Sequence, residues 1–177
     1  MNKELKDLAA WAVETAKTAG ADACEISVGK ERFVEVNYRD RKPETISEAT
    51  KSGLAVEVFV DGRYSASNTS DLRKGSLKTF IENTVTAAKL LAEDKFRSLP
   101  DPKYFQDMPA KDLKLYDPAY ESYSPEKRHE AARQLEDACL QTQGIDIISA
   151  QALVYDTFNE SVKLSSNGFE GYCRSTE

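Results

Sequence analysis

The sequence predicts an α+β fold with two layers, in which an antiparallel meander sheet is covered by helices on one face. Apolar residues recur at helical spacing within 5–19, 77–91 and 131–139. Between these segments apolar and polar residues alternate, as they do in half-exposed strands. The pairs Asp61-Gly62 and Asn167-Gly168 are typical of two-residue hairpin turns, which join antiparallel neighbours.

The amino-terminal segment is expected to form a helix and two long strands. Gly20 suits the position just after a helix, and the helix before it has an apolar face of Leu5, Leu8, Ala9, Ala12, Ala16 and Ala19. From Cys24 to Tyr38 the period changes to two, with a bend at Gly29, until Asp40-Arg41-Lys42-Pro43 breaks the strand. The second strand ends at Asp61-Gly62, and one side of it carries Leu54, Val56, Val58 and Val60.

The central segment is expected to hold a second helix and a surface strap. Asp71 can cap this helix, whose apolar stripe contains Leu77, Phe80, Ile81, Thr84, Val85, Ala88 and Leu91. Residues 97–123 combine four prolines, which oppose regular structure, with five aromatic residues, which oppose a free linker. The prolines are Pro100, Pro102, Pro109 and Pro118, and the rings expected to pack down are Tyr104, Phe105, Tyr116, Tyr120 and Tyr123.

The carboxy-terminal segment is expected to repeat the helix-then-strand order. Ser124 and Pro125 are typical of a capped helix start, and the apolar residues that carry this helix to Gly144 are Ala131, Ala132, Leu135, Ala138 and Cys139. Strands are expected from Ile145 to Phe158 and from Ser161 to Ser165. The predicted organisation is therefore a unit at 1–96, the strap at 97–123, and a second unit at 124–177 that is incomplete at its carboxy end.

A short internal similarity suggests that the helix-then-meander unit occurs twice. Thr18-Ala19-Gly20-Ala21-Asp22 resembles Thr142-Gln143-Gly144-Ile145-Asp146, and each ends a predicted helix. Two ordinary helix ends would explain the five residues equally well. The repeat is one of two open interpretations.

Composition excludes several classes of function. The chain has 177 residues, of which 30 are acidic and 24 basic, for a net charge of −6. Direct nucleic-acid binding is not expected, since a net negative charge gives no electrostatic attraction for phosphates. No apolar run of about 18 residues predicts a membrane span, and no leader peptide is expected. Cys24, Cys139 and Cys173 form no paired motif, so reduced thiols in a cytoplasmic protein are expected.

The polar run Ser65, Ser67, Asn68, Thr69 and Ser70 could form a binding lip or simply join a strand to a helix. No histidine lies nearby in sequence to activate a serine, and no G-x-S-x-G motif surrounds the run. Ser and Asp residues are also what a strand-to-helix junction needs. The structural interpretation is favoured.

His129-Glu130 begins a possible zinc helix, but neither H-E-x-x-H nor H-E-x-x-x-H is complete, and His129 is the single histidine. A solvated helix face is the better interpretation. The carboxylates of Asp22, Asp40, Asp61 and Asp71 fit turns or caps and match no calcium loop. The strap aromatics could bind a peptide, although burial explains them as well. No catalytic, cofactor-binding or metal-ligating residue is therefore predicted.

Several stretches, in their order and spacing, resemble the amino-terminal region of the TldD/PmbA family. They are Gly20-Ala21-Asp22, Glu25-Ile26-Ser27-Val28, Gly53-Leu54-Ala55-Val56, Val60-Asp61-Gly62-Arg63, Ala66-Ser67-Asn68-Thr69-Ser70-Asp71-Leu72, Leu99-Pro100-Asp101-Pro102 and Ser166-Asn167-Gly168-Phe169-Glu170-Gly171-Tyr172-Cys173. The Asn-Gly and Gly-Tyr-Cys ending is more similar to the PmbA (TldE) branch.

This resemblance implies an intracellular peptidase system in which TldD and PmbA subunits pair. It also implies zinc in the TldD branch, bound through an H-E-x-x-x-H helix outside this region, so no cofactor is expected in this chain. Family members are described as modulators of DNA gyrase and as processors of peptide antibiotics. The chain is expected to be a non-catalytic amino-terminal domain or fragment that serves scaffolding, subunit contact or substrate-chamber formation. The alternative is an independent protein-binding or regulatory module, for example a gyrase modulator, without a peptidase role.

Overall fold

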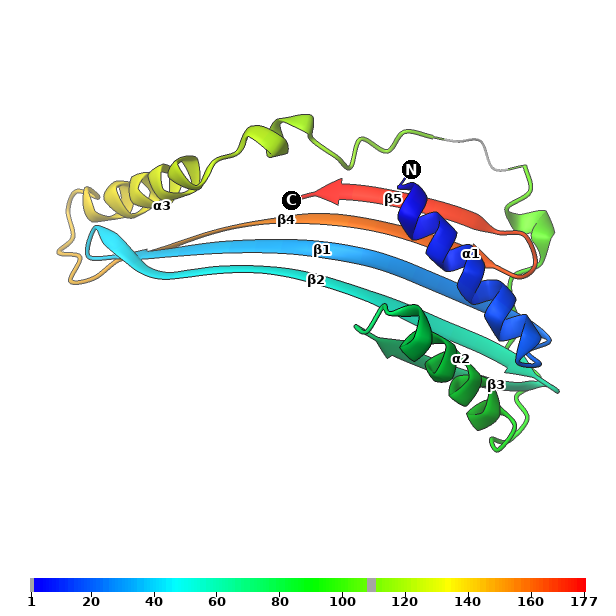
Figure 1. The fold of residues 1–177 in the computed structure, drawn as a ribbon. Helices are drawn as coiled ribbons and strands as arrows, with labels where there is room; N and C mark the ends of the chain where they lie inside the picture. Colours follow the sequence, from blue (N-terminus) through cyan, green and yellow to red (C-terminus); the bar gives the residue numbers. More distant parts are fainter. Residues whose placement is uncertain (1, 108–110) are drawn as a thin grey trace. The chain divides into compact units, whose positions relative to one another are not determined.

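The computed structural model describes residues 2–107 and 111–177, and within them the predicted α+β fold is confirmed (Figure 1). A five-stranded antiparallel sheet has the order β3-β2-β1-β4-β5. Pro109 of the strap lies outside the described residues. The elements are α1 (Lys3–Thr18), β1 (Ala23–Arg39), β2 (Lys42–Val60), β3 (Arg63–Thr69), α2 (Lys74–Ala88), η1 (Pro102–Tyr104), η2 (Pro118–Ser122), α3 (Pro125–Leu140), β4 (Gln151–Ser165) and β5 (Glu170–Thr176).

The first three strands form a meander, and the β4-β5 hairpin is added beside β1 instead of beside β3. β4 has 15 residues, β1 has 17 and β3 has only 7. A long strand satisfies more backbone N–H and C=O groups beside another long strand than beside a short one. The lengths therefore favour the position that β4 takes.

Two tight turns connect the meander. Asp61 and Gly62 have φ angles of 47° and 71°, as the predicted hairpin requires, and the register after the turn pairs Val60 with Arg63 and Leu54 with Thr69. Asp40 and Arg41 also have positive φ angles, 54° and 59°. The break expected across Asp40-Arg41-Lys42-Pro43 is therefore a two-residue turn, and β2 begins at Lys42, earlier than the apolar pattern indicated.

Of the two helix caps expected from the sequence, the one at Ser124 is confirmed and the one at Asp71 is wrong. Asn2 caps α1, and Ser124 caps α3 by accepting a hydrogen bond from the backbone N–H of Lys127. The expected cap of α2 is wrong, because Arg73 occupies the N-cap position without a side-chain hydrogen bond. Asp71 lies two residues earlier and binds the backbone N–H and guanidinium of Arg73. The Asp71 carboxylate therefore pairs with the neighbouring Arg73 and does not cap the helix.

The chain forms two compact units. Unit 1 comprises Met1–Lys30, Lys51–Asp112 and Glu160–Cys173, and unit 2 comprises Glu31–Thr50, Leu113–Asn159 and Arg174–Glu177. The division expected along the sequence, at 1–96, 97–123 and 124–177, stays a prediction.

Unit 1 contains an apolar core between two helices and one face of its strands (Figure 1). The predicted face of the first helix and the predicted alternation of the strands are both confirmed by burial. The buried set includes Ala9, Ala12 and Ala16 of α1, Leu77, Ile81 and Val85 of α2, and Cys24, Ile26, Val28, Leu54, Val56, Val58, Val60 and Val162 of the sheet. Removing this apolar area from water is the main stabilising contribution in unit 1.

The core of unit 2 is smaller, and its helix does not present the predicted face. Val36, Tyr38, Ala132 and Ala152 form the buried cluster. Among the residues of the expected stripe, Leu135 is 55% exposed, and Ala138 and Cys139 are exposed too. The buried face of α3 is instead Arg128, Ala132 and Glu136. Polar partners permit this, since the backbone N–H of Arg41 donates to Glu136 Oε2 at 3.0 Å.

The last strands start later than expected. β4 is continuous from Gln151 to Ser165, whereas residues 145–150 form no strand and Ile148 is 99% exposed.

No helix in the described part of the chain is long and apolar enough to cross a membrane.

The three cysteines are free, as expected, and the structure separates them by burial. Cys24 is buried, whereas Cys139 and Cys173 are exposed. Burial raises the pKa of the Cys24 thiol to about 11, which keeps it protonated and unreactive at neutral pH.

We expect a thiol reagent at pH 8 to modify two cysteines rapidly in the folded protein and the third only after unfolding. A pKa two units above the usual value leaves Cys24 about 100-fold less thiolate than an ordinary thiol. Because the folded pKa is raised, the stabilisation from Cys24 is complete below pH 9 and is lost as pH rises through about 11. Reagent kinetics check the first point. The free energy of unfolding at pH 8 and pH 10, with Cys24→Ala as control, checks the pH dependence. Equal reaction rates at all three thiols would contradict the burial of Cys24.

Candidate functional site

Segment 113–125 is fixed within unit 2 by hydrogen bonds to β5. The backbone N–H of Thr176 donates to the Leu115 carbonyl at 2.9 Å, and the N–H of Asp117 donates to Thr176 Oγ1 at 2.9 Å. Asp117 then caps the short helix η2. These contacts hold the aromatic part of the strap against the strands.

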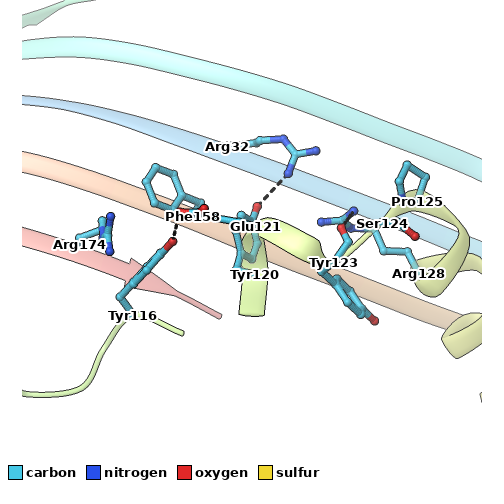
Figure 2. A pocket seen from close by; sticks show the side chains of 10 residues that line it. All are labelled: Arg32, Tyr116, Tyr120, Glu121, Tyr123, Ser124, Pro125, Arg128, Phe158 and Arg174. Carbon is cyan, nitrogen blue, oxygen red and sulfur yellow. Dashed lines mark hydrogen bonds between the residues drawn. The ribbon is translucent and has the colours of Figure 1, made fainter. Parts of the chain in front are cut away.

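A pocket of about 480 Å³ lies between this segment, the start of α3 and the strands (Figure 2). Its lining combines three arginines with four aromatic rings, a composition suited to binding. The lining residues are Arg32, Tyr116, Tyr120, Glu121, Tyr123, Ser124, Pro125, Arg128, Phe158 and Arg174.

Arg128 is the most deeply buried charge of the site. Its guanidinium donates from Nε and Nη2 to the two carboxylate oxygens of Asp156, and from Nη1 to the Tyr123 carbonyl at 2.7 Å. The two side chains of the ion pair are 3% and 8% exposed. The hydrogen bonds to Asp156 raise the pKa of Arg128. A bidentate pair of this kind fixes orientation as well as charge, so Arg128 holds the strap against β4.

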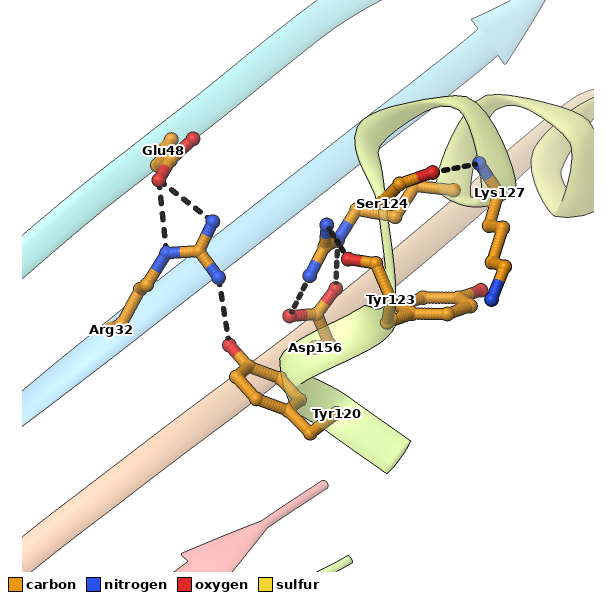
Figure 3. Close-up of polar contacts among 8 residues, drawn as sticks. Arg32, Glu48, Tyr120, Tyr123, Ser124, Lys127 and Asp156 are labelled. Carbon is orange, nitrogen blue, oxygen red and sulfur yellow. Dashed lines mark hydrogen bonds and ion pairs between the residues drawn. The ribbon is translucent and has the colours of Figure 1, made fainter. Parts of the chain in front are cut away.

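Arg32 connects β1 to β2 and to the strap. Its Nε donates to Glu48 Oε1 at 2.9 Å, and its Nη1 donates to the Tyr120 hydroxyl at 3.0 Å (Figure 3). Burial raises the pKa of Tyr120, and the hydrogen bond from Arg32 only partly opposes this. Tyr120 therefore stays a neutral phenol.

Arg174 lies on β5 with its guanidinium over the Tyr116 ring, 3.4 Å from the ring centroid. The Tyr116 hydroxyl donates to Glu121 Oε1 at 2.6 Å, and this bond raises the Tyr116 pKa. Among the described residues, no acceptor binds the N–H groups of Arg174 and no carboxylate pairs with it. The Arg174 charge is therefore available to a ligand.

Aromatic rings form the apolar wall. Phe158 contacts Tyr116 edge-on, with centroids 6.1 Å apart, and stacks with Tyr120 at 5.9 Å. A second hollow, of about 370 Å³, shares Tyr120 and Tyr123 with the first. The expectation that the strap rings pack down is confirmed for Tyr116, Tyr120 and Tyr123 and wrong for Tyr104, which is 67% exposed. Phe105 packs on Phe169 within unit 1.

The hydroxyl run and the aspartates named from the sequence lie in β3, in turns and next to a helix start, where they have structural roles. Ser65, Ser67, Asn68 and Thr69 belong to β3, and Ser70 follows it. Asp22 Oδ2 accepts from the backbone N–H of Asp61 at 2.7 Å, which ties a loop to the hairpin turn. Asp40 lies in the other tight turn and Asp71 binds Arg73. None of them lines the pocket described above.

His129-Glu130 lies on α3. Glu130 binds Arg133 and Gln134 on the exposed side of the helix, while the His129 ring packs edge-on against Tyr38 at 5.8 Å. In the described residues, no group of three or more His, Cys, Asp or Glu side chains could hold a metal ion. The residues of this region therefore do not fit a zinc site.

Sequence reasoning named three of the four pocket aromatics and missed Phe158 and the arginines. Arg32, Arg128 and Arg174 lie on separate elements, so no local motif joins them. One hint was available: Arg128 precedes Ala132 by four residues and Ala132 precedes Glu136 by four, which places all three on one face.

Comparisons with known proteins match this chain to one family. The family model described as PmbA/TldA metallopeptidase domain 1 matches residues 24–88. A candidate modulator of DNA gyrase from Bacteroides thetaiotaomicron is similar over 99% of this chain and 39% of its own, with 33% identity and a TM-score of 0.90. A comparison with curated protein sequences gave no match.

Two more distant structures share the fold. A candidate modulator of DNA gyrase from Thermotoga maritima is 12% identical with a TM-score of 0.76, over 97% of this chain and 37% of its own. TldE from Thermococcus kodakarensis is 18% identical with a TM-score of 0.75, over 96% of this chain and 37% of its own. The chain thus spans less than two fifths of the length of each of the three solved relatives.

Proposed function

Because the chain belongs to the TldD/PmbA family, we propose that it is a non-catalytic amino-terminal part of a PmbA (TldE)-like protein. It contributes scaffold, subunit contact and substrate-chamber wall to a peptidase assembly, and its pocket holds segments of peptide. The partner is a TldD-like subunit in the cytoplasm, which binds the zinc and cleaves the peptide.

The observation that supports this role is the chemistry of the pocket in unit 2. Arg32, Arg128 and Arg174 stay charged, since arginine does not lose its proton in proteins. The pKa values of Tyr116 and Tyr120 are raised, so both phenols keep their protons. The carboxylate in the lining, Glu121, already accepts from the Tyr116 hydroxyl, so the other groups offer hydrogen-bond donors and apolar surface. Such a pocket suits binding better than acid–base chemistry.

The zinc of the proposed assembly lies outside this chain. Glu130 is already bound by Arg133 and Gln134, and His129 is packed on Tyr38. The sequence has one histidine, and in the described residues neither side chain belongs to a group of three or more His, Cys, Asp or Glu that could hold a metal ion. The chain therefore contributes to peptide handling through its fold and its pocket.

A gyrase-modulating module is the competing function, since two of the similar structures are described as candidate modulators of DNA gyrase. The net charge of −6 opposes direct contact with DNA, so such a module would act on protein. The same experiment can test both functions.

We expect the full-length protein to co-purify with a TldD-like subunit of its own organism and to give one peak by size-exclusion chromatography with light scattering. Unfolded peptide should be cleaved by the pair and not by this protein alone. A chelator should abolish cleavage. A protein that forms no complex, yet changes the supercoiling rate of purified gyrase, would contradict the proposal and favour the regulatory module.

A further inference from the structure

We propose that the pocket of unit 2 binds a carboxylate group of a peptide, and that Arg174 is its main partner. This inference rests on the proposed peptide-handling function and adds the class of group that is recognised. The pocket residues 116, 120, 121, 158 and 174 carry the argument.

The position of Arg174 suits a planar anion. The face of its guanidinium is occupied by the Tyr116 ring at 3.4 Å, which leaves the N–H groups at the edge of the plane. Those groups have no acceptor among the described residues, and Arg174 is half-buried. A guanidinium presents a fork of N–H donors that matches the two oxygens of a carboxylate.

The other two arginines of the pocket are engaged and serve to hold its walls. Arg128 uses three of its nitrogens on Asp156 and Tyr123. Arg32 uses its nitrogens on Glu48 and Tyr120. Arg174 thus provides the charge that is not neutralised by an ion pair, on a wall that these two contacts keep in place.

Glu121 limits the charge of the ligand. Its carboxylate lies on the same Tyr116 side chain that carries Arg174, bound at the hydroxyl end at 2.6 Å. A second negative charge in this pocket is therefore repelled by Glu121 while one guanidinium attracts it. A singly charged carboxylate fits this balance better than a doubly charged phosphate.

The aromatic walls indicate that the carboxylate belongs to a larger molecule. Phe158 contacts both Tyr116 and Tyr120, and the three rings line a volume of about 480 Å³, which exceeds what a carboxylate fills. Rings of this kind bury the apolar part of a neighbouring residue. Both a carboxy-terminal carboxylate and an Asp or Glu side chain meet these requirements.

The test uses the full-length protein and three short peptides that differ in the carboxylate they carry, with binding measured by calorimetric titration. The first has a free carboxy terminus, the second has one Glu and an amidated end, and the third is amidated without an acid. We expect at least one acidic peptide to bind about tenfold more tightly than the neutral one, as for a charge-assisted hydrogen bond. Whichever acidic peptide binds more tightly than the neutral one identifies the source of the carboxylate.

Arg174→Ala should remove this preference, and Arg174→Lys should restore part of it. The matched control is Arg133→Ala, which removes the same charge from the exposed side of α3, outside the pocket. Unfolding midpoints of all variants confirm that they fold. Phosphate should compete less well than acetate.

Three results would overturn the inference. They are equal binding of all three peptides, an unchanged preference in Arg174→Ala, and stronger competition by phosphate than by acetate. Complex formation with the TldD-like subunit is measured separately. If the wild-type protein forms the complex but shows no preference for acidic peptides, only the carboxylate inference is contradicted. If it shows the preference but forms no complex, only the proposed assembly is contradicted.

Discussion

Replacing Arg128 with leucine should lower the free energy of unfolding by about 3–5 kcal/mol, because it leaves the buried carboxylate of Asp156 without its partner. Asp156 is 8% exposed at its side chain and takes two hydrogen bonds from Arg128. The same change removes the donor to the Tyr123 carbonyl. Urea unfolding followed by circular dichroism measures the loss, and hydrogen exchange should show it first in α3 and β4.

Two variants make this result specific to the ion pair. Arg133→Leu removes an arginine from the exposed side of the same helix, where the side chain is 51% exposed, and should change the free energy of unfolding by less than about 1 kcal/mol. The double change of Arg128 and Asp156 to leucine should recover much of the loss, since no charge is left unpaired. Equal losses for Arg128→Leu and Arg133→Leu would mean that the pair is solvated.

Unit 1 was predictable from the sequence because its elements follow their local periods. The apolar face of α1 is buried as expected, and burial alternates along β1 as its sequence pattern predicts. The turn at Asp61-Gly62 needs positive φ angles, which Gly and Asp adopt readily. In each case the residues near in sequence are sufficient to determine the local structure.

The sequence predicted that α3 forms, but it did not predict which face of α3 is buried. Its cap at Ser124 is local, so its start could be read from the sequence. Its buried face depends on Asp156, 28 residues away from Arg128, and on Arg41, 95 residues away from Glu136. Periodicity places Arg and Glu in solvent unless these distant partners are known.

The pocket was only partly predictable for the same reason. Three of its four aromatics, Tyr116, Tyr120 and Tyr123, occur in one short segment, and the number of rings in residues 97–123 indicated packing. Arg32 and Arg174 come from β1 and β5, which meet the strap only in the folded chain. A single sequence contains no spacing rule that joins three such segments.

The two units are stabilised by different means. Unit 1 has the larger apolar cluster and also buries Glu160, which accepts from Asn2 and Tyr172. The buried face of α3 in unit 2 depends more on hydrogen bonds and an ion pair. Apolar burial has no directional requirement, whereas a buried ion pair is favourable only with well-aligned hydrogen bonds. We therefore expect the stability of unit 1 to depend on its apolar core, which can be tested by making a cavity there.

Replacing Ile26 with alanine should lower the free energy of unfolding by about 2–5 kcal/mol, the usual cost of removing a large aliphatic side chain from a core. Ile26 is fully buried on β1, in the cluster that includes α1 and α2. The matched control is Ile46→Ala on β2, where the side chain is 56% exposed, with an expected change within about 0.5 kcal/mol. Ile26→Val should fall between them, at about 0.5–1.5 kcal/mol. Urea unfolding followed by Trp11 fluorescence reports on this core, because Trp11 packs against it. If Ile26→Ala costs no more than Ile46→Ala, the helices do not cover this face of the sheet.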